Sequence, residues 1–409
     1  MIYNTIAKQA DAAWKCSWDK FFCEKTSLFY DYLTSADLLE RHVHLPKPEE
    51  IAADRPNRTS WNSGMEDSSI NAGIMMEGVV NRFAVTGEEA MRDCAARIFK
   101  GMVNCATVHG VHGFIARSIS PFDCRSVYRE SSRDQYTHYV QGLFKFYNSP
   151  LSGEKERKTI RGILSWICDF MTAHVKEESD WSFPALDMQK PCSVCKVWKR
   201  NSWADARLPM FYAAAWSVTG RKEYYEKFRE YAHEAADITL RMPPVTIEGF
   251  LQYQIQCSLE LIRDVAVGDD VLREKCARSM RMIAELGVFY AWETRHHEKK
   301  TDFSILFSDW RKAESFYGKE PYRIPLFRPE MKDAFEKLRN SFQTAIVQFM
   351  APGWRFSEFQ KILLFSRMRE IDFENCNNSG VLYPACAFWK GRACGMIAQK
   401  EADEPFPTE

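Results

Sequence analysis

Apolar side chains recur at intervals of three and four residues through most of the chain, which is the period of a helix with a buried face. Strand-like alternation is almost absent, so the pattern predicts an all-α protein. Two kinds of helix can be told apart. The stretches 69–83 and 207–218 are apolar on nearly all sides, whereas 88–102 and 221–232 carry charges along one face. The first kind is typical of buried inner helices, and the second of half-exposed outer helices.

The two kinds alternate in a repeating unit. Residues 83–98 and 216–231 share an aromatic residue, a Thr-Gly pair and then a charged amphipathic segment, with Gly87 and Gly220 at matching positions. Gly153 and Gly268 mark further copies. Each copy is predicted to be a helix, a short glycine turn and a second helix. Such a hairpin cannot bury its apolar face alone, so it must stack on other copies of itself.

Six such hairpins closed on themselves would make an (α/α)6 barrel, a toroid with long loops over one rim. Four hairpins are clear, a fifth is expected from the 300s to 350, and a sixth from 354 to about 398. The N-terminal helices would pack outside the ring or close it. We expect residues 1–409 to form a single toroid domain, with 1–60 as N-terminal helices and lead-in. The four clear hairpins are 67–109, 133–178, 203–241 and 248–290.

An acidic residue stands at the head of the first helix in each clear hairpin: Asp67, Asp134, Asp205 and Glu248. Because the short turns lie at the opposite end, all four acids should share one rim with the long connections. Those connections are 110–131, 179–202 and the stretch from 292 into the 320s. Acids at helix starts also cap free N–H groups and favour the helix dipole, so capping is the competing interpretation. Long loops on a rigid scaffold favour a functional site at this rim.

Composition narrows the classes of function. The 55 basic and 55 acidic residues give a formal net charge of zero, so no basic field is available for nucleic acid or an anionic membrane. No apolar run is long enough to span a bilayer, and the N-terminus lacks the apolar core of a signal peptide. We expect a soluble cytoplasmic protein, or a periplasmic one whose signal peptide has been removed. Oligomeric state is left open.

The sequence predicts neither a metal site nor a cofactor. Cys192 and Cys195 form a C-x-x-C pair, but a structural zinc site would need a second pair or two spaced histidines, and His296 and His297 are adjacent. A local disulfide or two plain loop thiols are the expected alternatives. No glycine-rich phosphate loop is present.

Two motifs carry a resemblance to a known family. Residues 215–224 read A-W-x-V-T-G-x-x-x-Y, and Gly110, Gly113, Phe114 and Arg117 form G-x-x-G-F-x-x-R. Together with the inner-helix acids, they resemble the six-hairpin glycosidase superfamily over roughly residues 60–290. The resemblance implies work on carbohydrates, mostly hydrolysis of glycosidic bonds by acids in a central cleft. Asp134 resembles the catalytic aspartate of unsaturated glucuronyl and rhamnogalacturonyl hydrolases, whose fuller signatures are not found around it.

Glycoside cleavage needs one acid to protonate the leaving oxygen and a second carboxylate to activate water or attack the sugar. Asp134 is the first candidate, and Glu66 and Asp67 are the second. Arg133 and His138 lie near Asp134, although adjacent residues on a helix point apart, so a direct Arg133–Asp134 ion pair does not explain the motif. The predicted substrate-binding residues are Arg133, His138, Asp205, Glu248, Trp203, His112, Arg117 and Trp61, with Arg207 as a further possible carboxylate binder.

The predicted function is therefore a glycoside hydrolase acting on an oligo- or polysaccharide. A polysaccharide lyase or a sugar isomerase of the same fold is one alternative, and a non-catalytic carbohydrate-binding relative is another. The outer helices are heavily charged, which argues against a large partner surface. Isomerase chemistry favours facing histidines, but the sequence places only His138 on an inner helix near the acid rim.

Overall fold

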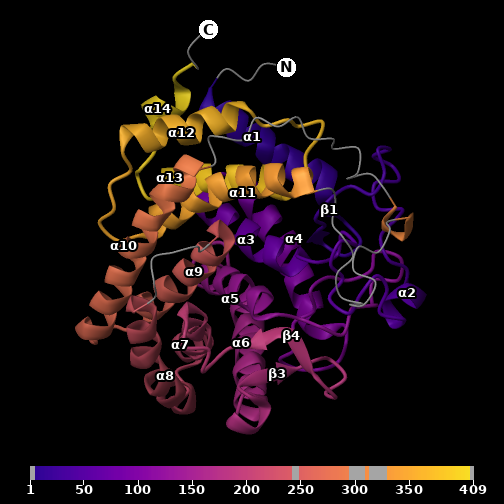
Figure 1. Ribbon diagram of the computed structural model, residues 1–409, viewed down its shortest axis with the longest axis vertical. Helices are drawn as coiled ribbons and strands as arrows, with labels where there is room; N and C mark the ends of the chain where they lie inside the picture. The colour runs from indigo at the N-terminus through magenta and orange to yellow at the C-terminus, as the bar shows by residue number, and fades with distance from the viewer. Residues whose placement is uncertain (1–4, 242–247, 294–308, 313–328, 406–409) are drawn as a thin grey trace.

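The computed structural model describes residues 5–241, 248–293, 309–312 and 329–405. Helices dominate these ranges (Figure 1), and the strands in them form two short antiparallel pairs. β1 (Phe22–Cys23) pairs with β2 (Leu28–Phe29), and β3 (Ser182–Pro184) pairs with β4 (Pro191–Lys196). No helix in the described part is both long and apolar enough to cross a membrane. The all-α prediction is confirmed.

Six inner helices form a closed ring, because each packs on the next and the last packs on the first. They are buried on most sides, as their apolar sequences predicted. The toroid of six hairpins is therefore confirmed. The inner helices are α3 (Ser68–Thr86), α5 (Arg133–Tyr147), α7 (Arg207–Thr219), α9 (Gly249–Val265), α11 (Pro329–Met350) and α13 (Ser379–Ala393).

The outer helices cover the ring, each with one face buried. They are α4 (Ala90–Thr107), α6 (Glu154–His174), α8 (Lys222–Leu240), α10 (Asp270–Glu293), α12 (Glu358–Arg369) and α1 (Ile6–Cys16). Two short helices, α2 (Pro48–Ala52) and α14 (Gln399–Asp403), lie in the lead-in and near the C-terminus. Figure 1 shows indigo α1 among the orange and yellow C-terminal helices.

The predicted bounds of the last two hairpins are wrong. The fifth hairpin is α11 with α12, so residues 351–357 form its internal turn and do not link two hairpins. The sixth inner helix, α13, takes its outer partner from the other end of the chain, which is α1. Of the two alternatives for the N-terminal helices, closing the ring is the correct one. Parts of the predicted fifth hairpin, 294–308 and 313–328, lie outside the described residues.

Arg82 joins the helices where the ring closes. Its guanidinium lies 5.1 Å from the ring centre of Trp14 on α1 and 4.7 Å from that of Trp389 on α13. It also forms a 3.0 Å ion pair with Asp11 of α1. Because Arg82 is on α3, this one side chain links the first inner helix, the last inner helix and the helix that covers them.

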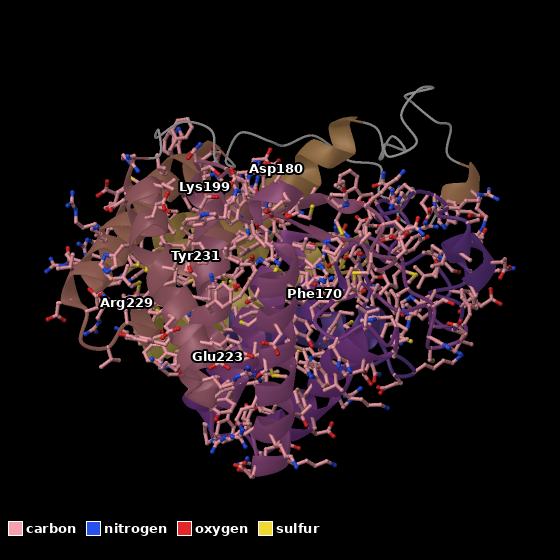
Figure 2. The ribbon with its side chains drawn as sticks, turned by 90° about the horizontal axis from the view of Figure 1, so that it is seen from below. Phe170, Asp180, Lys199, Glu223, Arg229 and Tyr231 are labelled. Atoms are coloured by element: carbon pink, nitrogen blue, oxygen red, sulfur yellow. The ribbon has the colours of Figure 1, made fainter. Side chains whose placement is uncertain are left out.

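The two ends of the toroid differ. At one end, Gly87 and Gly220 end α3 and α7 in the left-handed conformation, with φ of 66° and 69°, and lead directly into the outer helices. The long connections, 108–132 and 175–206, lie at the other end. Figure 2 shows the difference along α8, with Glu223 at its start and Lys199, from the connection before α7, toward its far end.

The inner helices α3 and α5 approach each other backbone to backbone at two glycines. A Cβ atom on Gly73 would lie 2.1 Å from the carbonyl oxygen of His138, and one on Gly142 would lie 2.7 Å from the Cα atom of Gly73. No side chain other than hydrogen fits at either place. The contact sets the distance between α3 and the part of α5 that carries His138.

Three buried charges and one half-buried lysine connect four of the inner helices inside the ring. Lys390 of α13 contacts Glu77 of α3 at 2.7 Å and Glu260 of α9 at 3.3 Å, and Lys145 of α5 contacts Glu260 at 2.7 Å. Although burial acts in the opposite direction, the two lysines hold the pKa of Glu260 well below its usual range. The cluster therefore ties together α3, α5, α9 and α13.

The glycine contact predicts the outcome of two alanine substitutions. Gly73→Ala should lower the free energy of unfolding by about 1–3 kcal/mol, because the added carbon overlaps the α5 main chain. Gly162→Ala, on outer helix α6 with nothing within 4 Å of the new carbon, should raise it by about 0.5–1 kcal/mol. Urea unfolding followed by circular dichroism measures both. Equal effects at the two positions would contradict the close approach.

Candidate active site

A cavity of about 420 Å³ lies at the end of the ring where the first residues of the inner helices gather. Residues from α3, α5, α9, α11 and α13 line it, together with the segment before α3, the connection before α5 and strand β4. The structure brings seven of the predicted site residues together here: Asp134, Asp67, Glu66, Glu248, His138, Arg117 and Trp61. Their catalytic and binding roles remain predictions.

Helix capping does not account for Asp67. The side chain of Asp67 makes no capping hydrogen bond at the start of α3. In the first turn of α3 the N–H of Ser69 donates to the carbonyl oxygen of Arg117 at 2.9 Å. The segment before the helix is held by a residue from the lead-in: Oδ2 of Asp31 accepts the main-chain N–H groups of Glu66, at 2.9 Å, and Asp67, at 3.1 Å. The carboxyl groups of Glu66 and Asp67 are thus available to the cavity.

Helix capping does not account for Asp134 on α5 or for Glu248 before α9 either. Ser132 is the N-cap of α5, and its side chain accepts the N–H of Gln135 at 3.3 Å. Glu248 precedes α9 without a side-chain capping bond. Neither Asp134 nor Glu248 is therefore held in place as a cap.

Asp134 forms an ion pair with a buried arginine. Nη2 of Arg207, on α7, lies 2.9 Å from Oδ1 of Asp134, and the Arg207 side chain is 1% exposed. Nε of Arg207 donates to Thr137 at 3.0 Å. Burial lowers the pKa of Arg207 to about 9, which leaves it a cation at neutral pH. Arg133 is farther away, with its Nε 3.9 Å from Asp134, so the nearer cation comes from another helix.

Glu66 retains its proton at neutral pH. Burial, and then the neighbouring charge of Asp67, raise the pKa of Glu66 to about 8, against the opposing influence of the Asn62 N–H group and two arginines, Arg117 and Arg339. Asp67 lies in a more polar setting, since its Oδ1 accepts Nε2 of Gln135 at 3.0 Å. Adjacent carboxyl groups therefore have different surroundings in one cavity.

His138 lies one helical turn after Asp134 and lines the same cavity. Burial lowers its pKa to about 3, so the imidazole is neutral at physiological pH. Its Nδ1 is 3.9 Å from the thiol of Cys257, and its ring lies against Tyr253, with 4.8 Å between ring centres. A neutral imidazole in this position can exchange hydrogen bonds with a hydroxyl group.

The other four predicted site residues do not line the cavity. Asp205 is buried and accepts the main-chain N–H groups of Arg200, at 2.9 Å, and Ser202, at 3.4 Å, which matches the capping interpretation. Trp203 covers the guanidinium of Arg207, 4.8 Å from its ring centre. Both residues precede α7, close to Arg207, and neither lines the cavity.

His112 and Arg133 also lie outside the lining. His112 is exposed and stacks on Trp166 of α6, with 4.1 Å between the ring centres. Arg133 is largely buried beside the connection before α7. Arg207, the proposed carboxylate binder, uses its guanidinium on Asp134. Arg133 and Arg207 thus lie next to Asp134 without lining the cavity, whereas His112 lies apart from the site.

Sequence reasoning missed several cavity residues. Arg339 of α11 and Tyr383 of α13 belong to hairpins whose bounds were misplaced, while Phe250 and Gln254 follow Glu248 on α9. Buried Nε atoms of Arg117 and Arg339 have no hydrogen-bond partner within the described chain. The acid pattern alone offered no signal for Asp31, because the lead-in lacks the hairpin repeat.

No group of three or more metal-binding side chains occurs among the described residues. The thirteen cysteines are free thiols. The C-x-x-C pair is therefore no disulfide, as one alternative held, and the expected loop is wrong, since both thiols are buried on strand β4. Sγ of Cys195 donates to the carbonyl oxygen of Cys192 at 2.6 Å. Sγ of Cys192 lies 3.6 Å from the carbonyl oxygen of Pro184.

No family model matches the sequence, and no curated protein matches it. Among solved structures, the Lin0763 protein from Listeria innocua is similar with a TM-score of 0.51 and 8% identity, over 94% of this chain and 96% of that protein. A family 76 glycoside hydrolase from a bovine Bacteroides thetaiotaomicron strain has a TM-score of 0.44 and 11% identity, over 95% and 78%. A reducing-end-xylose releasing exo-oligoxylanase has a TM-score of 0.44 and 12% identity, over 96% of each chain. At this identity the likenesses concern the fold.

The Arg207–Asp134 pair predicts a strong effect on stability. Arg207→Met should lower the free energy of unfolding by about 3–5 kcal/mol, because it leaves a partly buried carboxylate without its cation. Arg221→Met is the matched control, since Arg221 pairs with Glu223 at 2.6 Å but is 43% exposed. Its loss should cost under about 1 kcal/mol. Comparable losses in chemical denaturation would contradict a buried pair at the site.

Proposed function

We propose that this protein is a glycoside hydrolase that cleaves an oligo- or polysaccharide in the cavity at the acid end of the toroid. The observation that carries the proposal is that Glu66 and Asp134 line the same cavity in different environments. Burial, followed by the charge of Asp67, raises the pKa of Glu66 to about 8, and Asp134 is bound to a buried guanidinium. Two carboxyl groups held in different environments are what acid–base cleavage of a glycosidic bond requires.

In this mechanism Glu66 is the general acid. It donates its proton to the glycosidic oxygen as the bond from that oxygen to the anomeric carbon breaks. Asp134 supplies the ionised carboxylate, which either activates a water molecule or attacks the anomeric carbon. Arg207 holds Asp134 through one oxygen, Oδ1, and no protein bond to Oδ2 is seen among the described residues.

The rest of the lining suits a sugar. Trp61, Phe250 and Tyr383 offer aromatic faces to C–H surfaces, and the neutral imidazole of His138 can bind a hydroxyl group. Arg117 and Arg339 also line the cavity, and their guanidinium groups can donate hydrogen bonds to sugar oxygen atoms. His138 is the one histidine among the described lining residues, and this disfavours an isomerase that relies on two facing histidines.

The first test measures product release from a panel of neutral glycans and unsaturated uronyl oligosaccharides, with reducing ends and ultraviolet absorbance read together. Wild-type protein should turn over one class. Glu66→Gln and Asp134→Asn should each lower kcat by about 10²–10⁴-fold, because each removes a group that acts in the transition state. Both substitutions preserve side-chain shape, and circular dichroism checks that each variant is folded.

Glu154→Gln serves as the control, since Glu154 is an exposed acid at the start of outer helix α6. It should retain full activity. If no glycan is turned over by wild type while glycans still bind to wild type and variants alike, the hydrolase proposal fails in favour of a non-catalytic carbohydrate-binding protein.

The pKa of Glu66 predicts the pH dependence. A general acid works only in its protonated form, so kcat/KM should fall as the pH rises through about 8. The same decline should be absent from the residual activity of Glu66→Gln. A pH–rate profile from about pH 3 to 10 measures it, and a wild-type decline near pH 4 to 5 would assign the acid to another group.

A further inference from the structure

Two cysteines from opposite ends of the chain lie against each other where the ring closes. Cys16 is the last residue of α1, and Cys376 precedes α13, the inner helix that α1 covers. Their Sγ atoms are 3.9 Å apart, although 360 positions separate the two residues in the sequence. Both sulfur atoms lie near the carbonyl oxygen of Phe373, at 4.0 Å from Cys16 and 3.6 Å from Cys376. The closed ring therefore holds the two thiols in contact.

Other bonds hold the two segments together, so the contact does not depend on the sulfur atoms. Oγ of Ser17 donates to Oδ1 of Asn378 at 2.8 Å, and the N–H of Asn378 donates to the carbonyl oxygen of Asp31 at 2.9 Å. Nζ of Lys20 donates to the carbonyl oxygen of Phe373 at 2.7 Å. The chain beside each cysteine is thus fixed while the thiols are reduced.

A disulfide between the two thiols requires only a short movement. Such a bond is about 2.05 Å long, so the sulfur atoms, now 3.9 Å apart, must approach by roughly 1.8 Å. Rotation of a cysteine side chain about its Cα–Cβ bond can cover that distance. The main chain of Cys376 also belongs to the connection between α12 and α13 and not to a helix.

Cys16 is the thiol better placed to react first. The hydrogen bond with Cys376 lowers the pKa of Cys16, and the ammonium group of Lys20 acts in the same direction, although burial opposes both. The thiolate is the form of cysteine that reacts with oxidants. Cys16 and Cys376 are only 9% and 7% exposed, so the oxidant has to be small. Hydrogen peroxide meets that condition better than a bulky disulfide does.

We propose that Cys16 and Cys376 form a redox-modification site that reacts with a peroxide and yields a disulfide, which fastens α1 to α13. The Cys16 thiolate attacks one oxygen of hydrogen peroxide, the O–O bond breaks, and Cys16 becomes a sulfenic acid as hydroxide leaves. The Cys376 thiol then attacks the Cys16 sulfur, and its proton leaves with the sulfenic oxygen as water. The hydroxide takes up the proton that Cys16 had released. Two thiols thus lose two electrons, and one peroxide is reduced to two water molecules.

The inference concerns the closure of the ring and does not rest on the proposed function. The test uses the full chain with Cys124→Ser and Cys394→Ser, because these substitutions remove the two exposed thiols. Reduced protein is treated with hydrogen peroxide, alkylated under denaturing conditions and digested without reductant. Both cysteines of the pair are retained, so the measurement does not require a variant of a buried thiol to fold.

Mass spectrometry should find a peptide pair joined through Cys16 and Cys376, and dithiothreitol should separate it. Recovery of both residues as alkylated thiols would overturn the proposal. So would recovery of Cys16 as sulfinic acid without the cross-link, because a second thiol in contact should intercept the sulfenic acid before further oxidation.

Thermal unfolding measures what the disulfide does to the fold. Oxidation should raise the melting temperature by about 3–8 °C, because a cross-link between residues 360 positions apart restricts the unfolded chain. Cys16→Ala should abolish the rise. Cys168→Ala is the matched control, since this buried thiol bonds to the carbonyl oxygen of Phe211, and it should retain the rise. A rise of equal size in Cys16→Ala, or none in cross-linked protein, would contradict the fastening of α1 to α13.

The order of attack is measured with single alanine variants in the same background. In Cys376→Ala, peroxide should leave a sulfenic acid on Cys16 that dimedone traps, because the second thiol is missing. In Cys16→Ala, residue Cys376 should remain unlabelled. The reverse pattern of labelling would overturn the assignment of Cys16 as the thiol that reacts with peroxide.

Discussion

The ring of inner helices depends on contact between the two ends of the chain. Five hairpins are consecutive in sequence, but the sixth inner helix, α13, is covered by α1. Arg82 of α3 lies between Trp14 of α1 and Trp389 of α13 and pairs with Asp11 of α1, so a single cation joins these three helices. The helices α3 and α13 are apolar on nearly all sides. Without that closure, each would expose apolar side chains to water, and the fold would lose the free energy that their burial contributes.

Closure also determines the chemistry. The cavity takes residues from five of the six inner helices, so its acids meet only when the ring is complete. The approach of α3 and α5 at Gly73 places Asp134 and His138 beside the segment that carries Glu66. Farther along the same helices, the cluster of Lys390, Glu77, Glu260 and Lys145 connects four of them.

The environment of each acid separates a candidate catalytic group from a structural one. All four rim acids precede or begin an inner helix, and each could have been a cap. Asp205 is bound by main-chain N–H groups and is buried, which is a structural role. Asp67 and Asp134 are relieved of that role because the carbonyl oxygen of Arg117 and the hydroxyl of Ser132 accept N–H groups at the two helix starts. A cap provided by another residue leaves a carboxylate free for chemistry.

The sequence by itself determined the helical class, the hairpin repeat and the rim that holds the acids, because helix period and turn glycines are local properties. Seven of the predicted site residues came from that rim. Only the tertiary structure decided which outer helix closes the ring, and that Arg207 is the partner of Asp134. It also decided that Arg339 and Tyr383 line the cavity and that Asp31 holds the segment before α3. The reason is physical. Ion pairs, burial and pKa values depend on groups that are distant in the chain and adjacent in space, and no local period encodes those distances.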